Sequence, residues 1–177
     1  LDEPSALRAL KEISKKNIVF KTFIGKGLYN CNVPAVIKRN VFENPGWYTS
    51  YTPYQPEIAQ GRLEALMNYQ TMVSDLTGMD ISNASLLDEP TSAAEAMMLA
   101  KRVAKSKSNT FFINSKTFKQ TIAIIKSRAK PLGVEIEIGD CPDKEKEYFA
   151  AYFQYPNAEG SIEDLESVTK DIQAKGG

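Results

Sequence analysis

The chain has 177 residues, of which 42% are hydrophobic and 25% charged, values typical of one ordinary globular domain. Because 22 basic side chains balance 22 acidic ones, the zero net charge indicates no strong attraction to nucleic acid or an anionic membrane. The lack of histidine excludes a Ser-His-Asp or Cys-His catalytic unit and a histidine-ligated metal within this chain. Cys31 and Cys141 match no metal-binding spacing and are expected to be reduced thiols. No apolar run approaches the roughly 20 residues that span a bilayer, and the N-terminus shows no signal peptide.

Hydrophobic periodicity and terminus signals predict three helices in the N-terminal part. The first covers residues 2–16, with Ser5 as its candidate N-cap. A short helix over 34–40 begins with a proline at its first turn. The strongest helical pattern runs over 56–77, and Gly78 follows it as a C-cap.

The C-terminal part alternates between strand and helix patterns. The predicted elements are strand 81–87, helix 90–103, strand 111–113, helix 118–132, strands 134–138 and 148–154, and helix 162–174. Such alternation is typical of a parallel sheet covered by helices, so the predicted fold class is α/β, three-layered, with a mostly parallel sheet. A sheet with about three core strands is small, which indicates the first part of something larger.

The turn between the strand 81–87 and the following helix is a candidate phosphate site. Free N–H groups at a helix start bind anions, and Thr91 and Ser92 would add hydroxyl donors. Asp88 and Glu89, however, place two negative charges at the same helix start, where they favour the helix dipole and repel a phosphate. The turn has no glycine-rich fingerprint, and a self-capped helix is the alternative interpretation.

An aromatic loop precedes the strongest helix. Tyr48, Tyr51 and Tyr54 recur at every third position after Trp47, in a stretch that three prolines are expected to keep extended, with the tyrosines on one side. Tyrosine has a flat apolar face and a polar tip, which suits a small polar substrate or a partner chain. The alternative is a loop packed over the core or in an oligomer interface.

Two arginines flank this loop, and Gln55 ends it. Arg39 and Arg62 are each able to hold a carboxylate in a two-pronged contact, or to serve only in an ion pair. The sequence leaves both interpretations open.

The stretch NPGWYTSYTPYQPEIAQGRLEALMNYQ, residues 44–70, closely resembles the glycine dehydrogenase (decarboxylating) family, the P-protein of the glycine cleavage system. Further matching motifs are FIG at 23–25, VFEN at 41–44, DLTG at 75–78, NASLLDE at 83–89, AAEAM at 93–97, QTI at 120–122, RA at 128–129 and FQYP at 153–156. The resemblance covers nearly the whole chain and only the first part of the N-terminal half of such enzymes. Pro90 and Phe118-Lys119 depart from the family pattern, which commonly has Gly or Ala, and His-Pro, at these places.

The resemblance implies a partial large domain of the aspartate-aminotransferase-like, fold type I pyridoxal-phosphate enzymes. Residues 1–55 are expected to form an N-terminal arm with a helix and the aromatic loop, and residues 56–177 the partial α/β domain. By the same resemblance, the strands 134–138 and 148–154 flank the strand 111–113. The strand 81–87 is expected to be poorly paired, or paired with another molecule, because its partner belongs to a later segment of such enzymes.

The resemblance also implies a function. These enzymes decarboxylate glycine and transfer the aminomethyl group to the lipoyl group of the H-protein, using pyridoxal phosphate bound to a lysine that this sequence lacks. The site lies where two homologous halves meet, so residues of this chain are expected to contribute a wall: Tyr48, Tyr51, Tyr54, Gln55 and Arg39. The turn with Asp88, Glu89, Thr91 and Ser92 is expected to be a degenerate phosphate turn, with no cofactor bound to this chain alone.

The partners implied by the family are glycine, the H-protein, and the C-terminal half or second subunit of the enzyme, in a homo-oligomer without nucleic acid or membrane. The location implied is cytoplasmic in a bacterium, or the mitochondrial matrix in a eukaryote. A non-catalytic scaffold or interaction domain derived from the enzyme is the alternative function.

Overall fold

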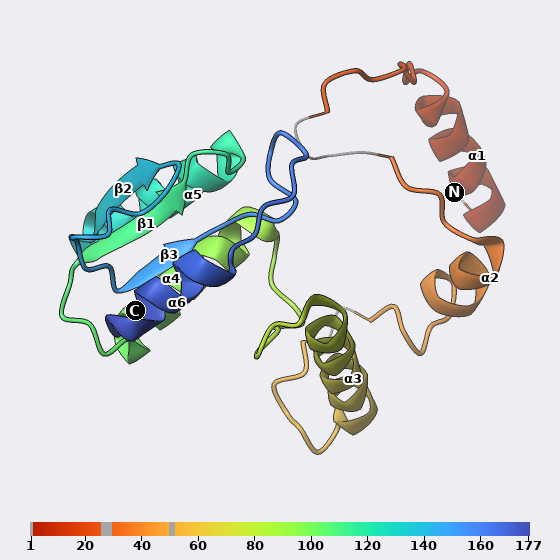
Figure 1. Cartoon of the computed structure of the whole chain (residues 1–177). Coiled ribbons are helices and arrows are strands. Elements are labelled where there is room, and N and C mark those ends of the chain that lie inside the picture. Colours follow the sequence, from red (N-terminus) through yellow and green to blue (C-terminus); the bar gives the residue numbers. More distant parts are fainter. Residues whose placement is uncertain (1, 26–29, 50–51) are drawn as a thin grey trace. The chain divides into compact units, whose positions relative to one another are not determined.

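The computed structural model describes residues 2–25, 30–49 and 52–177, and it divides into two units, Leu1–Asn30 and Cys31–Gly177. Its elements, labelled in Figure 1, are α1 (Glu3–Ser14), α2 (Ala35–Ile37), a π-helical turn (Lys38–Phe42), α3 (Gln60–Thr77), α4 (Glu89–Val103), β1 (Thr110–Asn114), α5 (Lys119–Ala129), a 3-10 turn (Lys130–Leu132), β2 (Glu135–Gly139), β3 (Ala150–Tyr152) and α6 (Glu166–Ala174). The predicted α/β class is confirmed.

In the first unit, α1 starts one turn before its predicted cap. Asp2 is the N-cap, and its side chain accepts a hydrogen bond from Ser5 N at 2.9 Å. The prediction that Ser5 caps the helix is therefore wrong, because the aspartate three residues earlier takes up the N–H group of Ser5. Leu7, Leu10 and Ile13 on this helix are each about 60% exposed.

The second unit begins with two helical segments that differ in length from the predicted ones. Pro34 is the N-cap of α2, and the helical turns continue to Phe42 rather than ending at residue 40. The helix α3 starts at Gln60, because the Gln55 carbonyl accepts from Ile58 N and Ala59 N in a separate turn. Its predicted end is confirmed: Gly78 is the C-cap, with a left-handed φ of 71° that glycine adopts without strain.

The predicted strand 81–87 is absent: no described residue in that range is in a strand. Ile81 and Leu87 are both 86% exposed. A strand requires a neighbour to pair its backbone groups, and the described residues offer none at this position. The assignment of this segment as a strand is therefore wrong for this chain, and its pairing with another molecule stays a prediction.

The three strands form one parallel sheet in the order β2-β1-β3, as the resemblance implied. The register pairs Phe112 of β1 with Glu137 of β2 and with Ala151 of β3. The strand β3 is shorter than predicted, because only residues 150–152 pair with β1. Both outer strands of this sheet are edges within the described residues.

The core lies mainly between the sheet and the pair α4 and α5. On that face of β1, Phe111 and Ile113 pack with Met97 of α4 and Ile125 of α5, and all four are at most 3% exposed. Alternation along a strand places Phe112 on the opposite face, where the rings of Tyr148 and Phe153 lie 5.7 and 5.8 Å from it.

The helix α6 belongs to the second face of the sheet. Ala151, on the Phe112 side, lines a groove of about 200 Å³ together with Thr169 and Ile172 of α6. The segment after α6 is bonded to the segment after α4, since the Gly176 carbonyl accepts from Lys105 N (2.9 Å) and Ser106 N (2.8 Å). The helices α4 and α5 thus cover one face of the parallel sheet, while residues of α6 line a groove with Ala151 on the other.

The buried Met97 offers a direct test of this core. Met97→Ala is expected to lower the free energy of unfolding by about 2–5 kcal/mol, because a fully buried side chain leaves a cavity between α4 and the sheet. Met67→Ala on α3 is the matched control, since Met67 is 62% exposed and its loss is expected to cost less than about 0.5 kcal/mol. Urea unfolding followed by circular dichroism measures both. Equal losses in the two variants would contradict the assigned core.

Candidate functional site

The aromatic loop, residues 44–55, begins with a tight turn built on Asn44. The Asn44 carbonyl accepts from Trp47 N (2.9 Å) and Tyr48 N (3.1 Å), and its side-chain Oδ1 accepts from Gly46 N (2.9 Å). A Cβ added at Gly46 would lie 3.2 Å from that Oδ1 atom, closer than ordinary contact, so glycine fits this turn best. Asn44 therefore sets the direction in which the chain enters the loop.

Two narrower turns follow within the described part of the loop. Thr49 N donates to the Trp47 carbonyl at 3.1 Å, and Tyr54 N donates to the Thr52 carbonyl at 2.7 Å. The predicted extended stretch is therefore wrong at these two places, because backbone groups without a sheet partner form bonds locally. Tyr51 lies outside the described residues.

The described aromatic side chains of the loop are exposed in this chain. Tyr54 is 85% exposed, Tyr48 59% and Trp47 49%. An apolar ring left in water loses the stabilisation that burial would give, so these rings fit a surface that contacts another molecule or another part of a larger protein.

The two flanking arginines bind different groups. Arg39, in the π-helical turn, donates from Nε to its neighbour Asn40 at 3.2 Å. Arg62, in the first turn of α3, donates from Nη2 to the Trp47 carbonyl at 2.9 Å. The structure thus links Arg62 to the aromatic loop, whereas the bond that it describes for Arg39 is local.

The turn before α4 is a self-capped helix start. Asp88 is the N-cap, and its Oδ1 accepts from Thr91 N at 2.9 Å, while Ser92 Oγ donates to the Asp88 carbonyl at 2.9 Å. The hydrogen bond from Thr91 holds the pKa of Asp88 below its usual range. Pro90, a departure from the family pattern, lies in the first turn, where its missing N–H group costs no helical bond.

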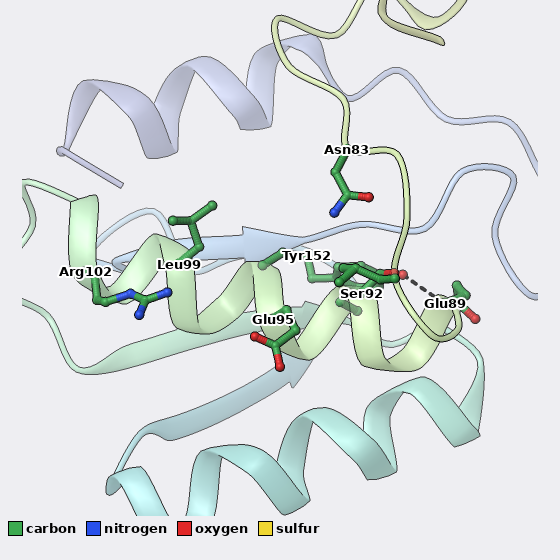
Figure 2. A pocket seen from close by; sticks show the side chains of 10 residues that line it. Asn83, Glu89, Ser92, Glu95, Leu99, Arg102 and Tyr152 are labelled. Carbon is green, nitrogen blue, oxygen red and sulfur yellow. Dashed lines mark hydrogen bonds between the residues drawn. The ribbon is translucent and has the colours of Figure 1, made fainter. Parts of the chain in front are cut away.

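Glu89, the first residue of α4, connects this helix to α5 and β3. Its Oε1 accepts from Thr121 Oγ1 of α5 (2.8 Å) and from Tyr152 OH of β3 (3.1 Å, Figure 2). Thr121 is fully buried. Burial, together with the negative charge of Glu89, raises the pKa of Tyr152. Sequence reasoning missed Thr121 and Tyr152, because side chains from residues 32 and 63 positions away meet Glu89 only in the tertiary structure.

An open groove of about 520 Å³ runs along α4 beside this cluster (Figure 2). Leu86, Ala96 and Leu99 contribute apolar surface, while Glu95 and Arg102 contribute charge. The two Glu89 bonds and the Asp88 cap hold the carboxylates at the start of α4, where a bound phosphate would meet their negative charge. The geometry therefore favours the self-capped interpretation of this turn.

The described part of the chain was found to contain neither a cluster of metal-binding side chains nor a helix able to span a membrane. No three histidine, cysteine, aspartate or glutamate side chains come close enough there to hold a metal ion. None of the helices described has the length and apolar character needed to cross a membrane.

Comparison with known proteins decides the family. The family model "Glycine cleavage system P-protein" matches residues 1–176. The chain belongs to the glycine cleavage system P-protein family. This confirms the resemblance inferred from residues 44–70 and from the shorter motifs.

Individual relatives agree with the family. The chain is similar to glycine dehydrogenase (decarboxylating) from Paraburkholderia phytofirmans, at 53% identity over 176 residues, which are 99% of this chain and 18% of that protein. It is also similar to the enzyme of the same name from Teredinibacter turnerae, at 56% identity over 177 residues, or 98% of this chain and 18% of that protein. The chain thus spans less than a fifth of the length of these family members.

A solved structure of the family has the same fold. The chain is similar to an inhibitor-bound glycine decarboxylase (P-protein) of the glycine cleavage system, with a TM-score of 0.80 and 29% sequence identity. The match covers 100% of this chain and 42% of that one. The described α/β part is therefore consistent with a partial fold type I domain.

The cap of α4 makes a testable prediction. Asp88→Ala is expected to lower the melting temperature, because Thr91 N loses its acceptor, whereas Asp88→Asn keeps an amide acceptor and is expected to retain most of the stability. The pKa of Asp88 is lowered in the folded state, so its charge stabilises the fold above the usual value of 3.8. That contribution is lost as the pH falls below 3.8 through the lowered pKa.

Thermal melts at pH 7 and at pH 2–3 measure these differences. The melting temperatures of the wild type and Asp88→Asn are expected to converge at the lower pH. A gap between them that is unchanged at low pH would contradict the role given to the charge.

Proposed function

We propose that this chain is part of a pyridoxal-phosphate-dependent glycine decarboxylase, which decarboxylates glycine and transfers the aminomethyl group to the lipoyl group of the H-protein. The observation that carries the proposal is the family match over residues 1–176. Relatives over 50% identical, named glycine dehydrogenase (decarboxylating), support it. Because the chain spans 18% of their length, the activity belongs to an assembly with the remaining part of such an enzyme.

The residues of this chain do not fit the phosphate group of the cofactor at α4. Asp88 already accepts from Thr91 N, and Ser92 Oγ is turned back to the Asp88 carbonyl. The carboxylate of Glu89 lies in the same turn. We therefore place the cofactor and its lysine in the remaining part of the enzyme, and assign no chemical step on the cofactor to this chain.

The role proposed for this chain is to supply one wall of the glycine pocket or of the lipoyl channel. Tyr48, Tyr51, Tyr54, Gln55 and Arg39 are the residues proposed for that wall. The exposure of Tyr48 and Tyr54, 59% and 85%, supports this role, since much of each side chain is left uncovered by the chain itself. Turns that fix the loop before a ligand arrives reduce the entropy lost on binding.

The surface of the α/β part supports the proposed assembly. Leu99 and Val103, four positions apart on α4, are 54% and 68% exposed, and Leu99 lines the open groove. A helix that is apolar on two faces is normally buried on both. We propose that the remaining part of the enzyme covers this face, and that residues 1–55 form an arm and 56–177 a partial domain.

A non-catalytic scaffold or interaction domain is the second candidate. The observation that favours it is the apolar face of α1, where Leu7, Leu10 and Ile13 are each about 60% exposed. For the enzyme, the proposed location is the cytoplasm in a bacterium or the mitochondrial matrix in a eukaryote. The proposed state is a homo-oligomer.

Conservative tyrosine variants of the full-length enzyme test the proposed wall. Tyr51→Phe and Tyr54→Phe are expected to slow glycine exchange about tenfold or more together, because each removes a polar tip while keeping the ring. Tyr155→Phe is the matched control, since Tyr155 is also exposed, at 59%, but lies outside the loop. Unchanged exchange rates in the loop variants would instead favour a loop that only packs against its neighbours.

A cofactor titration separates the two candidate functions from a self-sufficient enzyme. The purified 177-residue chain is titrated with pyridoxal phosphate, followed by visible absorbance and borohydride trapping. No specific lysine adduct is expected, because the turn at α4 holds carboxylates where a phosphate would bind. A stoichiometric, glycine-sensitive adduct at one lysine would overturn the assignment of the cofactor to the remaining part.

A further inference from the structure

Arg62 occupies a position that is locally unfavourable for a cation. It lies in the first turn of α3, a helix with no side-chain cap and no acidic residue in that turn. The helix dipole is positive at this end, so a cation there is unfavourable for the helix. Local helix stability therefore gives no reason for an arginine here, which points to a role outside the helix.

One hydrogen bond of Arg62 reaches the aromatic loop. Its Nη2 donates to the Trp47 carbonyl at 2.9 Å, across 15 positions of sequence. The same carbonyl accepts from Thr49 N at 3.1 Å. Both lone pairs of this oxygen are thus used, one by the turn around Tyr48 and one by α3.

The loop is consequently fixed from two sides. Asn44 orders the entry to Trp47 and Tyr48 through its carbonyl, and Arg62 ties the next turn to α3. A hydrogen bond from a guanidinium is about twice as strong as a neutral one. Trp47 and Tyr48 themselves are 49% and 59% exposed, so burial alone does not hold their rings.

We propose that Arg62 is a positioning residue, which orients Trp47 and Tyr48 by holding the Trp47 carbonyl against the start of α3. This inference rests on the proposed function, because the orientation matters only if the loop forms a wall of the glycine site. It assigns to Arg62 neither a carboxylate nor a catalytic step.

Trp47 is the only tryptophan in the chain, and its fluorescence reports the loop directly. In the 177-residue protein, Arg62→Met removes the guanidinium donors and keeps an unbranched stem. Acrylamide quenching of Trp47 is expected to rise about twofold, and its anisotropy to fall, since the charge-assisted bond to its carbonyl is lost. Arg62→Lys, which keeps one cationic donor, is expected to recover part of the difference.

Two controls keep the test decisive. Arg128→Met removes an exposed arginine from the last turn of α5 and is expected to leave Trp47 unchanged. Far-UV circular dichroism confirms that each variant keeps its helices. If Arg62→Met loses its helices, Arg62→Lys alone decides, because weaker ordering of Trp47 is expected there too. Quenching that matches the wild type in a folded Arg62 variant would overturn the proposal.

Kinetics of the full-length enzyme separate this inference from the proposed function. Arg62→Met is expected to raise the KM for glycine about fivefold, with a smaller change in kcat, since misplacing a pocket wall weakens binding. Stronger quenching of Trp47 with unchanged kinetics would support the positioning role of Arg62 and overturn the proposal that the loop forms a wall of the glycine site. Altered kinetics with unchanged Trp47 would overturn the positioning role.

Discussion

The strand β1 is the constraint on which the α/β part depends. It is the central strand of the sheet, paired in parallel with β2 on one side and β3 on the other. Phe111 and Ile113 face α4 and α5, while Phe112 faces the second layer, and none of the three is more than 3% exposed. The same strand therefore contributes side chains to the core with α4 and α5 and to the aromatic packing on the opposite face.

The start of α4 shows how this frame determines local chemistry. Once α4 and α5 pack on the same face of the sheet, Glu89, Thr121 and Tyr152 come within hydrogen-bonding distance. The carboxylate then serves to connect a helix start, a second helix and an edge strand. In the same turn, the side chain of Asp88 accepts the hydrogen bond of Thr91 N. The turn whose sequence suggested a phosphate site therefore connects structural elements in this chain.

Much of the fold could be predicted from periodicity alone. The strand Thr110–Asn114, the helix Glu89–Val103 and the end of α3 at Gly78 agree with the sequence, since local pattern and tertiary packing favour the same conformation. The segment 81–87 does not, because apolar residues form a strand only beside a partner, and the described residues supply none. The predicted N-cap Ser5 is also not observed, because Asp2, another residue type that caps helices well, is the N-cap of α1.

By itself, the sequence determined the α/β class through its hydrophobic spacing and the membership of the P-protein family through its long matching motifs. The order of the strands was implied by that resemblance and not by the spacing. The tertiary structure alone decided that Arg62 reaches the Trp47 carbonyl and that Tyr152 reaches Glu89. Both contacts join residues far apart in the chain, and no local pattern encodes a distance across the fold. Spacing along a chain predicts which face a side chain takes, whereas its partner depends on how the elements pack.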